Sequence, residues 1–301
     1  MPAELTPPDG DRSGDSTSPG GRWIRRAALA LMLAVGLVGS LAASNPNGPA
    51  AADSRLRELP PIYGLIYRLN DADRRISTAT QELIRSCMAS QGLSYAPQVE
   101  EVTREQVLSE LRPFGLETLS GATTAPPPPE TVADERHVLA LFGDPDQRVV
   151  ARGERLEVSA PATGCVADAE HRLLGENRMR GTEVRLRLFD GERDAREQLD
   201  RDPAFRSANA RWSACMRRAG IEAADPLQLL ETLPADIDLQ SHPAIRADVR
   251  CKGATQYLET AYVRLATLQR AWLDAHPEIP AEWIALREHQ DAVARQVLGT
   301  G

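Results

Sequence analysis

The sequence predicts a mainly α-helical protein, a disulfide-stapled helical bundle with a small β-hairpin, preceded by one N-terminal transmembrane or signal segment. Three observations support this prediction. Apolar residues recur every three or four positions over most of residues 62–301. One apolar run near the N-terminus contains no charge. The four cysteines all follow that run, and they fall at helix ends or on apolar helix faces.

The composition allows a packed core and argues against one class of partner. Of the 301 residues, 42% are hydrophobic and 26% are charged, a balance that excludes wholesale disorder. The formal net charge is -8, from 35 basic and 43 acidic residues. Because a nucleic-acid interface needs a basic face, we expect no nucleic-acid partner.

The pattern of the N-terminal region predicts export across a membrane. Residues 1–21 are rich in Pro, Gly, Ser and Asp and predict a disordered cytoplasmic leader. In residues 22–44, three arginines precede an uncharged run from Ala27 to Ala43. As a helix this run is about 26 Å long, close to the roughly 30 Å hydrocarbon core of a bilayer. The positive-inside rule then places the leader in the cytoplasm and the rest of the chain outside it.

Two fates of this segment stay open. An uncleaved anchor at residues 22–44 makes the chain a single-pass cell-membrane protein with its bulk extracytoplasmic, and the long acid-containing leader favours this fate. Cleavage near Ala42, beside the small residues Ser40 and Ala43, makes the protein secreted. In either case residues 45–61 form a linker, and residues 62–301 form the extracytoplasmic helical domain.

The first half of that domain alternates helices with loops. A helix begins at Asn70 or Asp71 and runs to about Gln91, with Ile76, Thr80, Leu83 and Cys87 on its apolar face. The other elements expected in this half are a short helix from the capping box at Thr103 and Gln106 to Leu111, a polyproline loop at 120–130, a helix at 132–142, a hairpin at 147–158 turning at Arg152-Gly153, and a helix at 165–174 ended by Gly175.

The second half begins with an ambiguous segment at 182–200. Its alternating Val184, Leu186 and Leu188 fit a strand, whereas its Glu- and Arg-rich tail fits a helix. Start signals at Asp202-Pro203 and Asp225-Pro226 then predict helices that run to Ala219 and to Leu233.

The C-terminal region has the strongest helical pattern. Apolar residues from Ala244 to Ala275 keep three- and four-residue spacing and predict one unbroken helix from Pro243 to Ala275. A final helix covers Trp283 to Val297, and the turn between the two predicts an antiparallel helical hairpin. A self-associating coiled coil is the alternative, but the alanine-rich start favours packing within the chain, so we expect a monomer.

A short pattern occurs twice, as Cys87-Met88 followed by Gly92-Leu93 and as Cys215-Met216 followed by Gly220-Ile221. Glycine just past a helix end adopts the left-handed conformation that stops the helix, and the next apolar residue folds back on the last turn. We therefore interpret Gly92 and Gly220 as helix C-caps and the two methionines as packing residues.

The four cysteines favour disulfides over other chemistry. Four cysteines allow three pairings, and the expected antiparallel packing of helix ends favours Cys87–Cys165 and Cys215–Cys251 over the crossed pairings. A zinc site normally needs ligand pairs two to four residues apart, which these cysteines lack. We expect no metal, no cofactor and no catalytic thiol.

These residues also carry a resemblance. The stretches Leu59–Tyr63, Cys87-Met88, Gly164-Cys165, Trp212–Met216 and Asp248–Lys252 resemble uncharacterised exported or membrane-anchored proteins of actinobacteria with repeated Cys-Met-x3-Gly helix ends. The resemblance implies a location in the cell envelope and implies no activity.

No catalytic motif stands out. Phosphate-binding loops, the Gly-x-Ser-x-Gly elbow and His-Glu-x-x-His are absent. In Glu170-His171 and Glu288-His289 the side chains diverge by about 100° on a helix. Carboxylates available for a catalytic pair are Asp71, Asp73, Glu82, Glu170, Glu231, Asp236, Asp238, Glu259 and Asp274, which a solvated surface also explains.

The sequence thus favours a non-catalytic extracytoplasmic cell-envelope protein with a binding or assembly role, whose partner is an unknown envelope or membrane protein. The alternative is a cell-wall hydrolase or related enzyme that uses a carboxylate pair. A third hypothesis is a carrier of a small ligand, held by an apolar strap that contains Tyr63 and Tyr67. Packing of that strap onto the bundle is the competing interpretation.

Overall fold

A computed structural model describes residues 59–67, 70–96, 111, 113–119, 134–234 and 237–299. The chain separates into Met1–Leu37 and Val38–Gly301, and all the described residues belong to the second unit. The expected leader, the segment at 22–44, most of the linker and the polyproline loop lie outside these residues, as does nearly all of the helix expected before Leu111. Within the described part of the chain, none of the helices has the length and apolarity that a membrane crossing needs.

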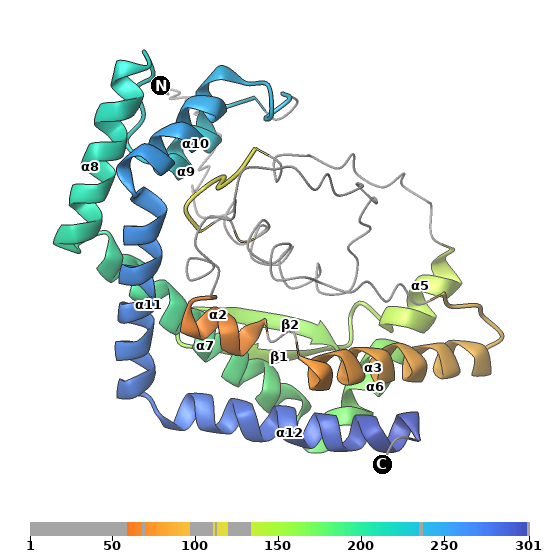
Figure 1. Ribbon diagram of the computed structural model, residues 1–301. Helices are drawn as coiled ribbons and strands as arrows, with labels where there is room; N and C mark the ends of the chain where they lie inside the picture. The colour runs from red at the N-terminus through yellow and green to blue at the C-terminus, as the bar shows by residue number, and fades with distance from the viewer. Residues whose placement is uncertain are drawn as a thin grey trace, which may run out of the picture. The chain divides into compact units, whose positions relative to one another are not determined.

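The described unit is mainly α-helical with one small antiparallel hairpin and two disulfides, which confirms the coarse fold class (Figure 1). Its helices and strands are α2 Pro61–Ile66, α3 Asp71–Ser90, α5 Glu135–Phe142, β1 Arg148–Arg152, β2 Glu157–Pro161, α6 Cys165–Leu174, α7 Arg178–Leu199, α8 Pro203–Arg218, α9 Pro226–Thr232, α10 Pro243–Thr255, α11 Tyr257–Ala275 and α12 Glu278–Leu298.

Side-chain caps explain why several helices begin where they do. The Asn70 side chain accepts a hydrogen bond from the Asp73 amide, and the Asp73 side chain accepts one from the Asn70 amide, which forms a capping box at the start of α3. Asp202 and Asp225 accept hydrogen bonds from the first turns of α8 and α9, each of which begins with proline.

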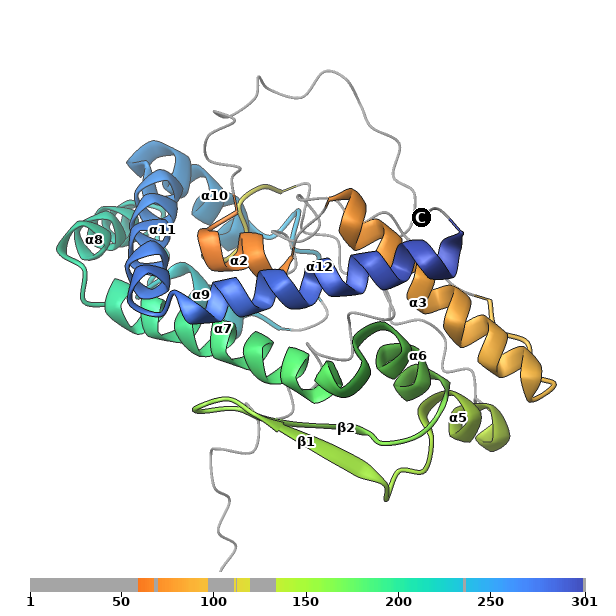
Figure 2. The ribbon, with the colours of Figure 1, turned by 90° about the horizontal axis from the view of Figure 1, so that it is seen from below.

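The hairpin packs along α7 (Figure 2). Arg148 lies opposite Pro161, and Arg152 lies opposite Glu157. The buried Asp190 of α7 accepts a 2.7 Å hydrogen bond from the Glu154 amide in the hairpin turn. The loop therefore depends on a carboxylate that lies far along the chain.

The ambiguous segment at 182–200 is helical and forms most of α7. Val184 and Leu188 lie in a cluster with Trp272 and Trp283, whereas Leu186 lies under the hairpin turn beside Gly153. Because α7 is covered on more than one side, apolar residues occupy several of its faces and imitate the alternation of a strand.

The prediction of one unbroken helix from Pro243 to Ala275 is wrong. Gln256 adopts a left-handed conformation, with φ of 54°, and divides the segment into α10 and α11. α10 packs against α8, whereas α11 packs against α7 as well as α8. The apolar seam therefore faces different neighbours before and after Gln256.

The predicted antiparallel hairpin of the last two helices is also wrong. α12 packs against α3, α6 and α7, and it leads away from α11 instead of returning along it (Figure 1). The Trp283 indole donates a 2.8 Å hydrogen bond to the Leu65 carbonyl, which ties α12 to the end of α2. α12 thus packs mainly against α3, which is distant in sequence, and not against the preceding helix α11.

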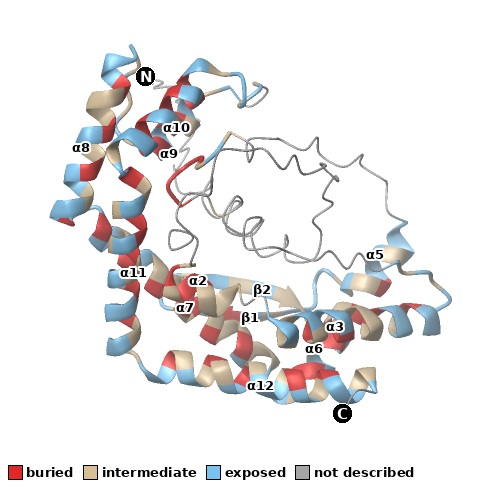
Figure 3. Cartoon of the chain, viewed as in Figure 1, coloured by how far each residue is buried: buried red, intermediate tan, exposed pale blue. Residues whose placement is uncertain are grey.

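The buried residues, which are red in Figure 3, form several clusters between the helices. The largest cluster joins α8, α10 and α11 around Trp212, Tyr257 and Leu265. A smaller cluster around Cys165 joins the C-terminal end of α3 to the N-terminal end of α6.

Candidate functional site

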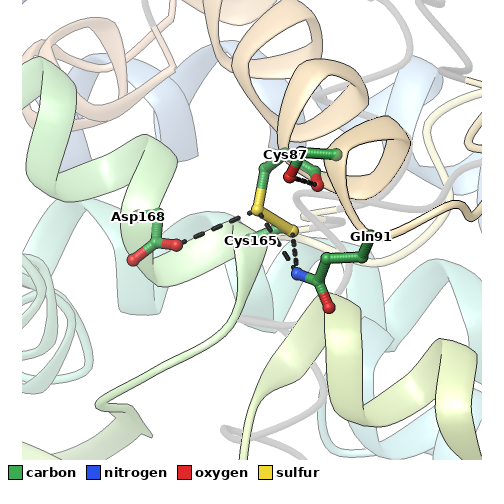
Figure 4. Close-up of a disulfide and its surroundings, with 5 residues drawn as sticks. Cys87, Gln91, Cys165 and Asp168 are labelled. Atoms are coloured by element: carbon green, nitrogen blue, oxygen red, sulfur yellow. Dashed lines mark hydrogen bonds between the residues drawn. A yellow bond between two sulfur atoms is a disulfide. The ribbon is translucent and has the colours of Figure 1, made fainter.

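The first disulfide joins Cys87, near the end of α3, to Cys165 at the start of α6, with the two Cα atoms 5.6 Å apart (Figure 4). The Gln91 side-chain nitrogen lies 3.3 Å from the Cys165 sulfur, and an Asp168 oxygen lies 3.9 Å from the Cys87 sulfur. A disulfide sulfur carries no proton, so the Asp168 contact is not a hydrogen bond.

The second disulfide joins Cys215 in the last turn of α8 to Cys251 in α10, with the Cα atoms 5.7 Å apart. The pairing in the structure is the one that the sequence favoured, and no described cysteine is left free. Both bridges therefore connect the end of one helix to a later helix.

The two repeated helix ends have the same backbone geometry. Gly92 and Gly220 have φ values of 72° and 76°. The amide after each glycine donates a 3.0 Å hydrogen bond to the carbonyl of Met88 or Met216, and both methionines are fully buried. These contacts form the Schellman motif, in which glycine provides the left-handed residue.

A buried polar cluster lies next to the second disulfide. Lys252, the only lysine in the chain, is 1% exposed, and Asp248 is 0% exposed. The Lys252 ammonium donates hydrogen bonds to Asp248 Oδ2 at 2.7 Å and to the Leu116 carbonyl at 2.6 Å. The Trp212 indole donates a 2.9 Å hydrogen bond to Asp248 Oδ1.

Burial dominates the electrostatics of this cluster. Loss of hydration raises the pKa of Asp248 and lowers the pKa of Lys252, and the attraction between the two groups opposes both shifts. Burial also raises the pKa of the nearby Glu117, which accepts a hydrogen bond from the Tyr262 hydroxyl. Burial therefore shifts these groups toward their neutral forms compared with exposed groups of the same kind, while Asp248 and Lys252 remain an ion pair.

The chain segment Pro113–Leu119 covers this cluster. Phe114 packs edge-on against Tyr262, with ring centroids 5.0 Å apart, and Gly115 lies so close to Lys252 that a Cβ there would stand 3.1 Å from the amine. Gly115 has φ of 76°, which favours glycine. This close approach brings the Leu116 carbonyl within hydrogen-bond distance of the Lys252 amine.

Sequence reasoning missed this cluster as a site. Asp248 and Lys252 are four residues apart in a helix and share a face, beside the apolar positions 247 and 251. The available signal was Lys252 itself, because the other 34 basic residues of the chain are all arginines.

The strap residues Tyr63 and Tyr67 belong to α2 and the residue after it. Tyr63 is buried in the largest cluster, and its hydroxyl donates a hydrogen bond to Glu192 and accepts a 2.8 Å one from Arg196. The Tyr67 ring meets the Tyr63 ring edge-on, with centroids 6.3 Å apart. Both rings thus pack onto the bundle.

The carboxylates that the sequence offered for a hydrolase lie on several different elements of the structure. Asp71, Asp73, Glu82 and Glu170 each form an ion pair with a different arginine. Glu231, Glu259 and Asp274 are exposed, Asp238 accepts hydrogen bonds in a turn, and Asp236 lies outside the described residues. Among the described residues, three or more histidines, cysteines or acids are nowhere grouped to hold a metal ion.

A charged pocket of about 180 Å³ lies between the hairpin turn, α7 and the start of α12. Arg180 in its wall donates hydrogen bonds to Glu282 at 2.6 Å and to Glu183 at 3.2 Å. The hydrogen bond from Arg180 holds the pKa of Glu282 below its usual value. Glu278, in the first turn of α12, also lines the pocket.

Comparisons with known proteins give no match. No protein-family model matches the chain, and neither a curated protein nor a solved structure is similar to it.

Proposed function

We propose that the protein acts outside the cytoplasm as a non-catalytic cell-envelope protein with a binding or assembly role. The observation that carries this proposal is the pairing of all four cysteines in two disulfides. Disulfides persist in oxidising compartments and are rare in the reducing cytoplasm. The segment at 22–44 supplies the expected route, either as an anchor or as a signal cleaved near Ala42.

Two further features support this role. The expected resemblance to exported actinobacterial proteins, at the cysteine and tryptophan stretches, agrees with this location and implies no activity. The pocket beside the hairpin offers both signs of charge, from Arg180 and Arg187 and from Glu183 and Glu278. Most of these charges pair with one another, so a small polar group that carries both charges could replace one of the pairs, and we propose the pocket as a contact surface for such an envelope component.

The compartment is tested in intact cells of the host. Cells are treated with a membrane-permeant thiol reagent that adds mass, before lysis, and the chain is examined on a denaturing gel. We expect no labelling without reductant and labelling at four cysteines after reduction. Protease added to spheroplasts should digest the region 62–301 while a cytoplasmic marker protein stays intact.

A double variant, Cys87→Ser with Cys165→Ser, is the matched control for this labelling. If the pairing is the one described, it should stay unlabelled before reduction and gain two labels afterwards, whereas a crossed pairing would leave Cys215 and Cys251 free to label without reductant. Free thiols in untreated wild-type cells, together with protection of the region 62–301 from protease, would contradict an extracytoplasmic location.

The cell-wall hydrolase remains a second candidate because carboxylates gather at the pocket. Glu183, Glu278 and Glu282 all line it, although Arg180 holds two of them in hydrogen bonds. Purified protein that releases soluble fragments from peptidoglycan would support the enzyme, provided that Glu278→Gln abolishes the release. The surface variant Glu222→Gln is the control and should leave the release unchanged.

A further inference from the structure

The surroundings of Lys252 fit an amide better than an ammonium. An ammonium has three protons to donate and a carboxylate accepts several hydrogen bonds. In the described part of the chain the Lys252 amine meets two acceptors, and Asp248 meets the Trp212 indole besides the amine itself. Both side chains are almost completely buried, so bulk solvent does not supply further partners.

An amide between the two side chains would match this set of partners. Its single N–H would keep the hydrogen bond to the Leu116 carbonyl, which now lies 2.6 Å from the amine. Its oxygen would be Asp248 Oδ1 and would keep the 2.9 Å hydrogen bond from the Trp212 indole. Each remaining polar atom of the cross-link would then have a partner.

We propose that Lys252 and Asp248 condense spontaneously into an intramolecular isopeptide bond within α10. The Lys252 nitrogen already lies 2.7 Å from Asp248 Oδ2. The two residues are four positions apart in one helix, and the flexible lysine side chain can move the nitrogen onto the carboxyl carbon without a change in the backbone.

The reaction needs no oxidant and no co-reactant. A proton first passes from the ammonium to Oδ2, which gives a neutral amine and a neutral carboxylic acid. The nitrogen lone pair then attacks Asp248 Cγ, and a second proton moves from the nitrogen to Oδ2. The bond between Cγ and Oδ2 breaks, one water leaves, and one N–H stays on the new amide.

The surroundings support each of these steps. Burial lowers the cost of the first proton transfer, because it raises the pKa of Asp248 and lowers the pKa of Lys252. The Trp212 indole donates to the oxygen on which negative charge develops during the attack. Fixed contact between the two groups replaces a bimolecular encounter, and the dry core opposes the reverse hydrolysis.

The single lysine makes the test direct. Full-length protein with both disulfides formed is reduced, denatured and weighed intact by mass spectrometry, and then digested with trypsin. We expect the intact mass to fall short of the sequence by one water. Because trypsin does not cut after an acylated lysine, residues 247–250 should remain joined to residues 251–264 in one product.

The matched control is Lys252→Arg, which keeps the positive charge but has no primary amine to acylate. It should show the full mass of its sequence under the same treatment. An unmodified Lys252 that trypsin cleaves, with residues 247–250 released, in chains that carry both disulfides would overturn the proposal. A deficit of one water that persists in Lys252→Arg would overturn it as well.

Discussion

At Cys87 and at Cys215 the chain repeats one sequence pattern, and both copies build the same helix end with a glycine at positive φ and a fully buried methionine. The surroundings differ. The Cys87 bridge lies in a small cluster with the exposed groups of Gln91 and Asp168 beside it. The Cys215 bridge adjoins the largest cluster and the buried ion pair of Asp248.

The difference shows which properties are local. Hydrogen bonds within six residues determine how the helix stops, so both copies have the same geometry. The partner helix and the polar neighbours come from distant parts of the chain, so they differ between the copies. Variants that change both regions in parallel separate these two contributions.

Removal of each disulfide should give the largest effect. Loop-closure entropy predicts that Cys87→Ala with Cys165→Ala, which opens a separation of 78 residues, costs about 4–5 kcal/mol of unfolding free energy. The corresponding change of Cys215 and Cys251, with a separation of 36, should cost about 3–4 kcal/mol. Urea unfolding of both double variants measures the order, and a reversed order would show that the surroundings outweigh loop length.

Loss of the buried carboxylate should be nearly as costly. Asp248→Ala leaves the Lys252 cation buried without its partner and should reduce the unfolding free energy by about 3–5 kcal/mol. Asp248→Asn combined with Lys252→Met should recover at least half of that loss, because it removes the charge and keeps an acceptor for Trp212.

The matched change at the other bridge is Asp168→Ala. This exposed acid of the first turn of α6 should contribute under about 1 kcal/mol, through its interaction with the helix N-terminus. Equal losses in Asp168→Ala and Asp248→Ala would remove the proposed contrast between the two regions. Denaturant unfolding with both disulfides intact measures the comparison.

Replacement of either helix-ending glycine should lower the unfolding free energy by the same amount. Gly92→Ala and Gly220→Ala should each cost about 1–2 kcal/mol, because alanine is strained at positive φ. A Cβ at either position has open space around it, so the cost comes from the backbone alone. Thermal unfolding of the two variants should give the same loss within about 0.5 kcal/mol, and a clear difference would show that packing contributes at one of them.

Acid sensitivity should differ slightly between the two regions. The helix of Cys215 starts at Asp202, and the hydrogen bond from Arg264 lowers the pKa of this acid. The helix of Cys87 starts at the neutral Asn70. A lowered pKa stabilises the fold at every pH above the unfolded value of about 4, and this stabilisation disappears as the pH falls through the folded value.

The corresponding variant is Asp202→Asn, which keeps a capping side chain. It should lose under about 1 kcal/mol at pH 7 and should show a smaller further loss between pH 5 and pH 3 than the wild type. Urea unfolding at the three pH values measures this. If the variant lost as much unfolding free energy between pH 5 and pH 3 as the wild type, protonation of Asp202 would not contribute to the acid sensitivity.

Local signals predicted much of the fold. Gly164 and Gly175 gave the bounds of α6, and the Asp-Pro pairs gave the starts of α8 and α9. The break at Gln256 had only a weak signal, Gly253 in the last turn of α10, and the apolar spacing continues across it. The partner of α12 was equally hidden, since α3 lies about 200 residues earlier.

The buried cluster could not be predicted for the same reason. The helix spacing puts Asp248 and Lys252 on one face, but the burial that changes their chemistry depends on Trp212 and on the carbonyl of Leu116. The latter contact joins residues 136 positions apart. Patterns of neighbouring residues carry no information about that approach.

The order of the two disulfides along the chain has a consequence for proteolysis. Because Cys165 precedes Cys215, the bridges close two separate covalent rings, 87–165 and 215–251. A single nick inside either ring, including one in the proline-rich stretch at 120–130, leaves the fragments attached. A single nick between 165 and 215, within or beside α7, leaves no covalent link between the two pieces, so only packing such as that of α12 on α3 would hold them together.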